Sequence, residues 1–172
     1  FEGDVDVFGY DVFYKCPSLQ SVTLPQNLTS IPDGTFSSCS SLEKIILPEG
    51  IVSIGNNAFT SCSSLKEINL PEGIVEIGFA VFDGCESLSS LVLPSKLNTI
   101  EMYAFKNCSA LKEITIPESV LEIKSLAFES CTSLETLTIR SKTAKLFSNI
   151  LAGASLLTEI RFEGTCEEWY GL

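Results

Sequence analysis

Cysteine is the residue type of this sequence whose spacing could carry chemistry. The 172 residues include seven cysteines and no histidine. Cysteine thiols can form disulfides, act as nucleophiles or bind zinc. Six of the cysteines follow one another at intervals of 23 residues, each at the end of a Phe-x-x-Cys sequence: Cys16, Cys39, Cys62, Cys85, Cys108 and Cys131. The fixed interval predicts that these six occupy equivalent positions in a repeating fold and form a ladder along its axis.

The ladder favours buried free thiols over disulfides or zinc sites. Neighbouring turns of such a fold lie about 5 Å apart, which is within the Cα range of a disulfide. However, equivalent side chains of neighbouring turns point in the same direction rather than toward one another. A structural zinc site needs four ligands around one point, whereas a ladder spreads them along a line. We therefore expect the thiols to pack as small hydrophobic groups, and we expect no metal or other cofactor.

The sequence lacks the other common catalytic and metal-binding patterns. Without histidine, it has neither the usual general base nor the most common metal ligand. It contains no phosphate-binding G-x-x-x-x-G-K-[ST] sequence and no G-x-S-x-G nucleophile motif. Residues 4–9 superficially resemble a calcium-binding loop, but Phe8 and Lys15 occupy positions that require oxygen ligands. The sequence therefore predicts a protein that is not an enzyme.

The elements that position the cysteines repeat with the same interval of 23 residues. A strict period of this length is typical of a solenoid, in which each repeat buries its apolar face only against its neighbours. Two further columns keep the period: Phe13, Phe36, Phe59, Phe82, Phe105 and Phe128, and Leu19, Leu42, Leu65, Leu88, Leu111, Leu134 and Leu157. These columns indicate packing rather than chemistry.

Each repeat combines a short strand with a segment that suits a helical turn. It opens with L-x-x-(L/I/V)-x-(L/I), whose last apolar residues alternate with polar ones as in a half-buried strand. A proline such as Pro48 ends this strand because it cannot donate to a ladder. Two more core residues follow, for example Ile51 and Ile54, and then A/V-F-x-x-C, which suits one turn of α- or 3₁₀-helix. We expect an α/β solenoid with parallel strands on one face and helical turns on the other.

The repeat pattern resembles that of a known family. L-x-x-I-x-L-P-x-x-(L/I/V)-x-x-I-x-x-x-A-F-x-x-C-x-S is similar to the BspA-like, Treponema-type leucine-rich repeats of bacterial and protozoan surface proteins. Ile160, Phe162, the sequence 163–165 (Glu-Gly-Thr) and Trp169 resemble a segment that often closes such arrays. The resemblance implies a right-handed solenoid displayed outside the cell, with roles in attachment or host-protein binding. It implies no catalytic residues.

The period divides the chain into an array and a closing segment. We expect the leucine-rich repeat array to span residues 1–162, followed by a C-terminal cap at 163–172. Within the array, a partial repeat at 1–18 precedes full repeats at 19–156 and a closing strand at 157–162. The last full repeat is atypical, with Arg140, Leu151 and Ala154 in the proline, phenylalanine and cysteine positions. Terminal repeats often differ in this way, and we expect Trp169 and Tyr170 to cover the last coil.

Charge and hydropathy exclude several classes of partner. The net charge of −11 disfavours nucleic acid, whose affinity depends on Lys and Arg, and anionic membrane surfaces. No apolar run approaches the roughly 18 residues of a membrane-spanning helix, so we expect no insertion into a membrane. The family resemblance implies that the partner is another protein.

Two surfaces of the predicted solenoid could contact a partner. A solenoid's natural site is its strand face, whose outward candidates are Lys44, Ile46, Glu67, Asn69, Val92, Glu113 and Thr115. This set has no aromatic anchor, so an ordinary solvated face is the alternative. Before the helical turn, adjacent coils bring together Phe79, Met102, Tyr103 and Leu126. These four side chains either form an exposed apolar patch of the kind that marks interfaces or tuck over the edge of the core.

These expectations give two functional hypotheses. The first is a monomeric, non-enzymatic cell-surface or secreted module for protein binding and adhesion, whose partner is a host matrix or cell-surface protein. The alternative is a structural spacer that displays another domain and has no ligand of its own. A binding module should carry a concentrated apolar or aromatic patch, and a spacer an evenly polar surface.

Overall fold

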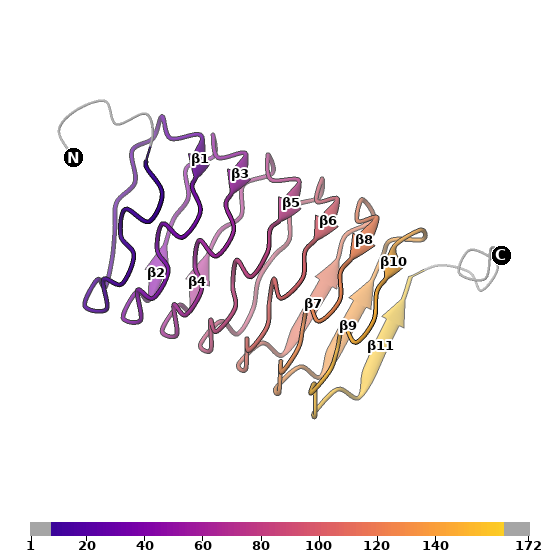
Figure 1. Ribbon diagram of the computed structural model, residues 1–172. Coiled ribbons are helices and arrows are strands. Elements are labelled where there is room, and N and C mark those ends of the chain that lie inside the picture. Colours follow the sequence, from indigo (N-terminus) through magenta and orange to yellow (C-terminus); the bar gives the residue numbers. More distant parts are fainter. Residues whose placement is uncertain (1–7, 164–172) are drawn as a thin grey trace.

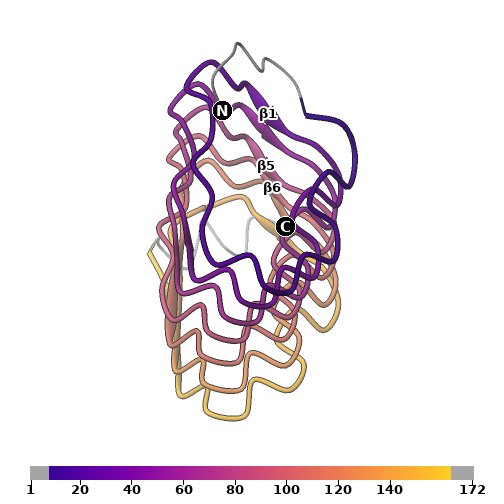
Figure 2. The same ribbon diagram turned by 90° about the vertical axis from the view of Figure 1, so that its left-hand side faces the viewer.

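The chain forms a stack of similar coils. The computed structural model describes residues 8–163. Figure 1 shows the coils side by side along one axis, in sequence order, and Figure 2 looks along that axis, where successive coils overlie one another. The predicted solenoid of stacked repeats is therefore confirmed. Most of the predicted cap (164–172), including Cys166, Trp169 and Tyr170, lies outside the described residues, and the boundary at residue 162 stays a prediction.

One side of the coils carries the predicted parallel strands. Equivalent residues of adjacent repeats pair in register, for example Lys44 with Glu67 and Thr136 with Glu159. The ladder has two separate parts, β2-β4 and β7-β9-β11. Its strands are β2 (Lys44–Ile45), β4 (Glu67–Ile68), β7 (Glu113–Ile116), β9 (Thr136–Ile139) and β11 (Glu159–Phe162). We call this side the strand face.

A second ladder of short parallel strands follows the turn after the strand face in each full repeat (Figure 1). Each strand has two residues, and the second points into the core except in the last strand. The sequence predicted the core residues here but not the strands. They are β1 (Ser30–Ile31), β3 (Ser53–Ile54), β5 (Glu76–Ile77), β6 (Thr99–Ile100), β8 (Glu122–Ile123) and β10 (Lys145–Leu146).

The predicted helical face is wrong: residues 8–163 contain no helix. The third side consists of consecutive turns, which we call the turn face. Its main-chain N–H groups alternate between two kinds of acceptor. The N–H of Thr60 donates within the coil to Asn57 O at 3.1 Å, whereas that of Phe59 donates to Val81 O of the next coil at 3.0 Å. An α-helix would require every N–H to bond four residues back. Bonding between coils therefore replaces the helix.

The core consists of columns of identical or similar residues that run along the stack. The phenylalanine rings from Phe13 to Phe128 stack face to face, with centroids of neighbouring rings 5.2–5.7 Å apart. Those from Phe36 onward are completely buried. Each ring packs against the equivalent ring of the next coil, so the core is continuous although no repeat has a core of its own.

The cysteine ladder has a structural role. Its described thiols are free, and those from Cys39 to Cys131 are completely buried. The Sγ atom of Cys62 donates a hydrogen bond to Phe36 O at 3.1 Å, and the N–H of Cys39 donates to the same oxygen at 3.0 Å. The thiol thus satisfies the second lone pair of a buried carbonyl. The bond recurs with the same spacing of 26 residues up to Cys131.

Candidate functional site

The four residues of the predicted apolar patch lie together on the turn face. Phe79 is 38% exposed, and Met102, Tyr103 and Leu126 are partly buried. The Phe79 and Tyr103 rings contact edge to face, with centroids 5.7 Å apart. The side chains are neither fully exposed nor tucked into the core, and their role in binding stays a prediction.

A charged pair fixes one side of this patch. The Lys106 Nζ atom lies 4.7 Å from the centroid of the Tyr103 ring and 2.8 Å from a Glu129 carboxylate oxygen. Hydrogen bonding to Glu129 raises the pKa of Lys106, so this side chain stays cationic at neutral pH. The cation over the ring and the edge contact from Phe79 hold Tyr103 in one orientation.

The strand-face candidates divide into paired and available side chains. Lys44 and Glu67 form an exposed salt bridge of 2.7 Å. The Asn69 carboxamide accepts a hydrogen bond from Leu47 N at 2.7 Å and donates one to Leu47 O at 2.9 Å. Its polar atoms are thus occupied by hydrogen bonds to the main chain of the preceding coil. The remaining candidates are exposed: Ile46 at 53%, Val92 at 85%, and Glu113 and Thr115.

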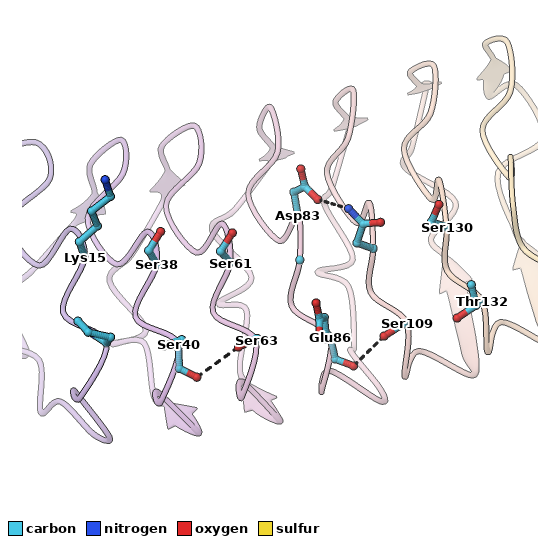
Figure 3. Close-up of a pocket in the computed structure, with 13 residues that line it drawn as sticks. Lys15, Ser38, Ser40, Ser61, Ser63, Asp83, Glu86, Ser109, Ser130 and Thr132 are labelled. Carbon is cyan, nitrogen blue, oxygen red and sulfur yellow. Dashed lines mark hydrogen bonds between the residues drawn. The ribbon is translucent and has the colours of Figure 1, made fainter.

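Sequence reasoning missed a groove along the turn face. The groove has a volume of about 910 Å³ and spans six coils, with two rows of mostly small polar side chains (Figure 3). The rows come from the repeat positions just before and just after each cysteine. A search for small polar columns beside the core columns would have found them. The labelled lining residues are Lys15, Ser38, Ser40, Ser61, Ser63, Asp83, Glu86, Ser109, Ser130 and Thr132.

Several polar groups of this groove already bond to the protein. Asp83 accepts a hydrogen bond from Asn107 at 3.0 Å, and the Ser63 and Ser109 hydroxyls donate to carbonyls of the preceding coil at 3.4 Å (Figure 3). Burial raises the pKa of Asp83, and the Asn107 hydrogen bond opposes this rise. The groove is thus a polar surface whose bonds mainly join one coil to the next.

Nothing in the described part of the chain assembles a metal site, since no three acidic or cysteine side chains come together in a suitable cluster. Residues 8–163 also contain no helix that is long and apolar enough to cross a membrane.

The repeat, the coil and its strands define a leucine-rich repeat solenoid. The chain matches the BspA type leucine rich repeat region over residues 1–85 and 75–170, in six copies. It therefore belongs to the BspA-type leucine-rich repeat family. No curated protein matches it.

Solved bacterial structures share the fold. A Treponema pallidum leucine-rich repeat protein is 29% identical over 83% of this chain and 69% of its own, with a TM-score of 0.74. A Bacteroides ovatus leucine-rich repeat protein is 25% identical over 90% of this chain and 57% of its own, with a TM-score of 0.60. A leucine-rich cell surface protein of Faecalibacterium prausnitzii, 22% identical over 92% of this chain and 64% of its own, has a TM-score of 0.52 and shows the fold alone.

Proposed function

We propose that this chain is a non-enzymatic module, displayed on the cell surface or secreted, that binds a protein partner through a rigid repeat surface. Leucine-rich repeat solenoids generally serve as scaffolds for protein interactions, and one structural neighbour is described as a cell surface protein. A matrix or cell-surface protein of a host is the partner that the family resemblance suggests.

The observation that carries this proposal is the partly exposed aromatic cluster on the turn face. A spacer needs only an evenly polar surface. It would not need an aromatic cluster in which Phe79 is 38% exposed beside Tyr103. Rigid aromatic side chains held by their neighbours lose little conformational entropy on binding, and Tyr is enriched at binding hot spots. We therefore place the principal contact at Phe79, Met102, Tyr103 and Leu126.

The test is binding of the purified chain to immobilised extracellular-matrix proteins. The Phe79→Ser, Met102→Ser, Tyr103→Ser variant should lose at least about tenfold in affinity, because aromatic anchors dominate such contacts. A matched control replaces three exposed apolar residues elsewhere, Val52→Ser, Val75→Ser and Leu121→Ser. We expect the control variant to bind like the parent chain.

Thermal unfolding followed by circular dichroism establishes that both variants are folded. Equal binding by the parent and the patch variant would move the contact to the strand face. Failure of the parent chain to bind any matrix protein or cell-surface extract would favour the spacer hypothesis instead.

A further inference from the structure

The strand face is interrupted at residues 90–93. On the strand face of the described residues, no strand separates β4 from β7, and Figure 1 shows a bare coil there. Within the part of the chain that the structure describes, no main-chain N–H or C=O group of residues 90–93 makes a hydrogen bond. Pairing resumes with Lys112, whose N–H donates to Ser89 O at 3.4 Å. Sheet hydrogen bonds lie in the plane of the sheet and point toward neighbouring strands. The unpaired groups therefore face the spaces on either side of the segment.

A shallow groove occupies each of these spaces. The groove toward β4 has a volume of about 330 Å³ and includes Leu70, and the groove toward β7 has a volume of about 440 Å³ and includes Ile114. Leu91 lines both grooves, and Leu70 and Leu91 are only partly buried. Val92 stands between the grooves and is 85% exposed. Each groove thus combines apolar side chains with unsatisfied main-chain donors and acceptors.

The charges around the grooves are unbalanced. Residues 88–95 carry no charge. The two cations of the lining, Lys66 and Arg140, are held in salt bridges by other carboxylates, each at 3.0 Å. The lining carboxylates Glu72 and Glu113 form no salt bridge with another described residue, although Glu72 Oε2 accepts hydrogen bonds from Ser95 N at 2.9 Å and Ser95 Oγ at 2.7 Å. An uncharged centre between two carboxylates that lack a cationic partner complements a ligand that is neutral in its middle and cationic on both sides.

We propose that this interruption, residues 90–93 with its two grooves, is a docking site for an extended segment of a partner polypeptide with a neutral centre and basic flanks. Threonine and asparagine side chains suit the centre, because each offers a donor and an acceptor to the unpaired main-chain groups. The methyl group of threonine can also cover Leu70 and Leu91. Lysine or arginine on each side would pair with Glu72 and Glu113. The inference rests on the proposed protein-binding function but uses a different surface from the aromatic patch.

A labelled peptide tests this site directly. The probe is a fluorescent heptapeptide, Lys-Thr-Val-Thr-Asn-Thr-Lys, titrated into the full chain at low ionic strength. Its matched control has glutamate at both ends and should bind at least about tenfold more weakly. Val92→Lys should abolish binding of the lysine peptide, and Glu72→Gln with Glu113→Gln should weaken it about tenfold. Val75→Lys, at a valine that is 52% exposed outside the two grooves, should leave the affinity unchanged.

Amide hydrogen exchange separates docking from nonspecific attraction to an acidic protein. The amides of residues 90–93 should exchange fast in the free chain and slow down when the lysine peptide is added. Equal affinity for both peptides, unchanged exchange at these amides, or full binding by Val92→Lys would each overturn the proposal. Matrix binding measured on the same variants distinguishes the two hypotheses. If Val92→Lys binds matrix proteins normally while the peptide never binds, only the docking site is refuted.

Discussion

At the scale of single residues, the turn face imposes a left-handed backbone at two positions of every coil. Glycine occupies some of these positions, as at Gly34 and Gly84 with φ of 64° and 75°. Ala80, Tyr103 and Leu126 adopt φ of 51–61° without being glycine. A left-handed conformation costs an L-residue about 1–2 kcal/mol. Two of these three strained residues belong to the aromatic patch, so the side chains that we assign to binding are kept despite a conformational cost.

Ala80→Gly should therefore stabilise the protein by about 1 kcal/mol, because glycine adopts φ near +51° without the clash of a Cβ atom. Ala104→Gly is the matched control. Ala104 is also buried but is not among the positive-φ residues, so glycine there should destabilise the fold by about 1 kcal/mol. Urea unfolding of both variants measures the difference. Destabilisation by Ala80→Gly would contradict the assigned backbone conformation.

At the scale of elements, stability depends on how closely one coil approaches the next. Gly55 follows β3 and lies against the preceding coil. A Cβ atom at this position would be 2.4 Å from Asp33 N and 2.7 Å from Pro32 C. Both are main-chain atoms, so neither can turn away as a flexible side chain would. Gly50, in contrast, would bring a Cβ atom no closer than 3.6 Å to another residue.

Gly55→Ala should thus lower the free energy of unfolding by about 2 kcal/mol, as overpacking usually does when the backbone must shift. Gly50→Ala should change it by less than about 0.5 kcal/mol. Chemical denaturation of the two variants, followed by circular dichroism, makes the comparison. If both alanines were tolerated equally, the coils would have to be less tightly apposed than the structure indicates.

The elements also show how far the sequence alone could lead. The 23-residue period predicted the solenoid, the strand face and the core columns, because identical residues can share a column only if coils stack in register. The helical prediction failed because the A/V-F-x-x-C pattern fits one helical turn as well as it fits the non-helical turns of the structure. The hydrogen bonds that decide between helix and turn go to the next coil. The interruption at residues 90–93 was unpredictable for a similar reason, since its repeat, with Leu91, Leu93 and Pro94, follows the motif.

The geometry of the two predicted contact surfaces could be predicted from the sequence to different extents. The proximity of Phe79 and Tyr103 could be predicted, since neighbouring repeats place them side by side. The involvement of Asn69 in main-chain hydrogen bonding could not, because the outward direction of a residue does not reveal whether its polar atoms are occupied. The polar groove was missed because serine columns carry no chemical signature of their own and stand out only through their period.

At the scale of the whole molecule, the cysteine ladder couples the stability of the array to pH. Burial raises the pKa of Cys62 and Cys131 to about 12 and that of Cys85 and Cys108 well above its ordinary value. In the unfolded chain, thiols ionise near pH 8.5. The native state therefore keeps protons that the unfolded state releases above this pH. The stability that the thiols contribute is fully present below about pH 8.5 and declines as the pH rises toward 12.

We accordingly expect the free energy of unfolding to fall steeply between pH 8 and pH 10, by about 1.4 kcal/mol per pH unit for each fully buried thiol once the unfolded chain is ionised. Urea unfolding at several pH values measures the slope.

Lysine and tyrosine also begin to titrate in this range, so Cys85→Ala is the control that isolates the thiols. This variant should be less stable at pH 7 because it leaves a cavity and removes one of the two hydrogen bonds that the Phe59 carbonyl accepts. Once the thiols of the unfolded chain are ionised, its slope should nevertheless be shallower by about 1.4 kcal/mol per pH unit, because one ionising thiol is gone. Identical slopes in the parent and the variant would mean that Cys85 is open to solvent or already ionised in the folded array, and the stacked core described here would then be wrong at its centre.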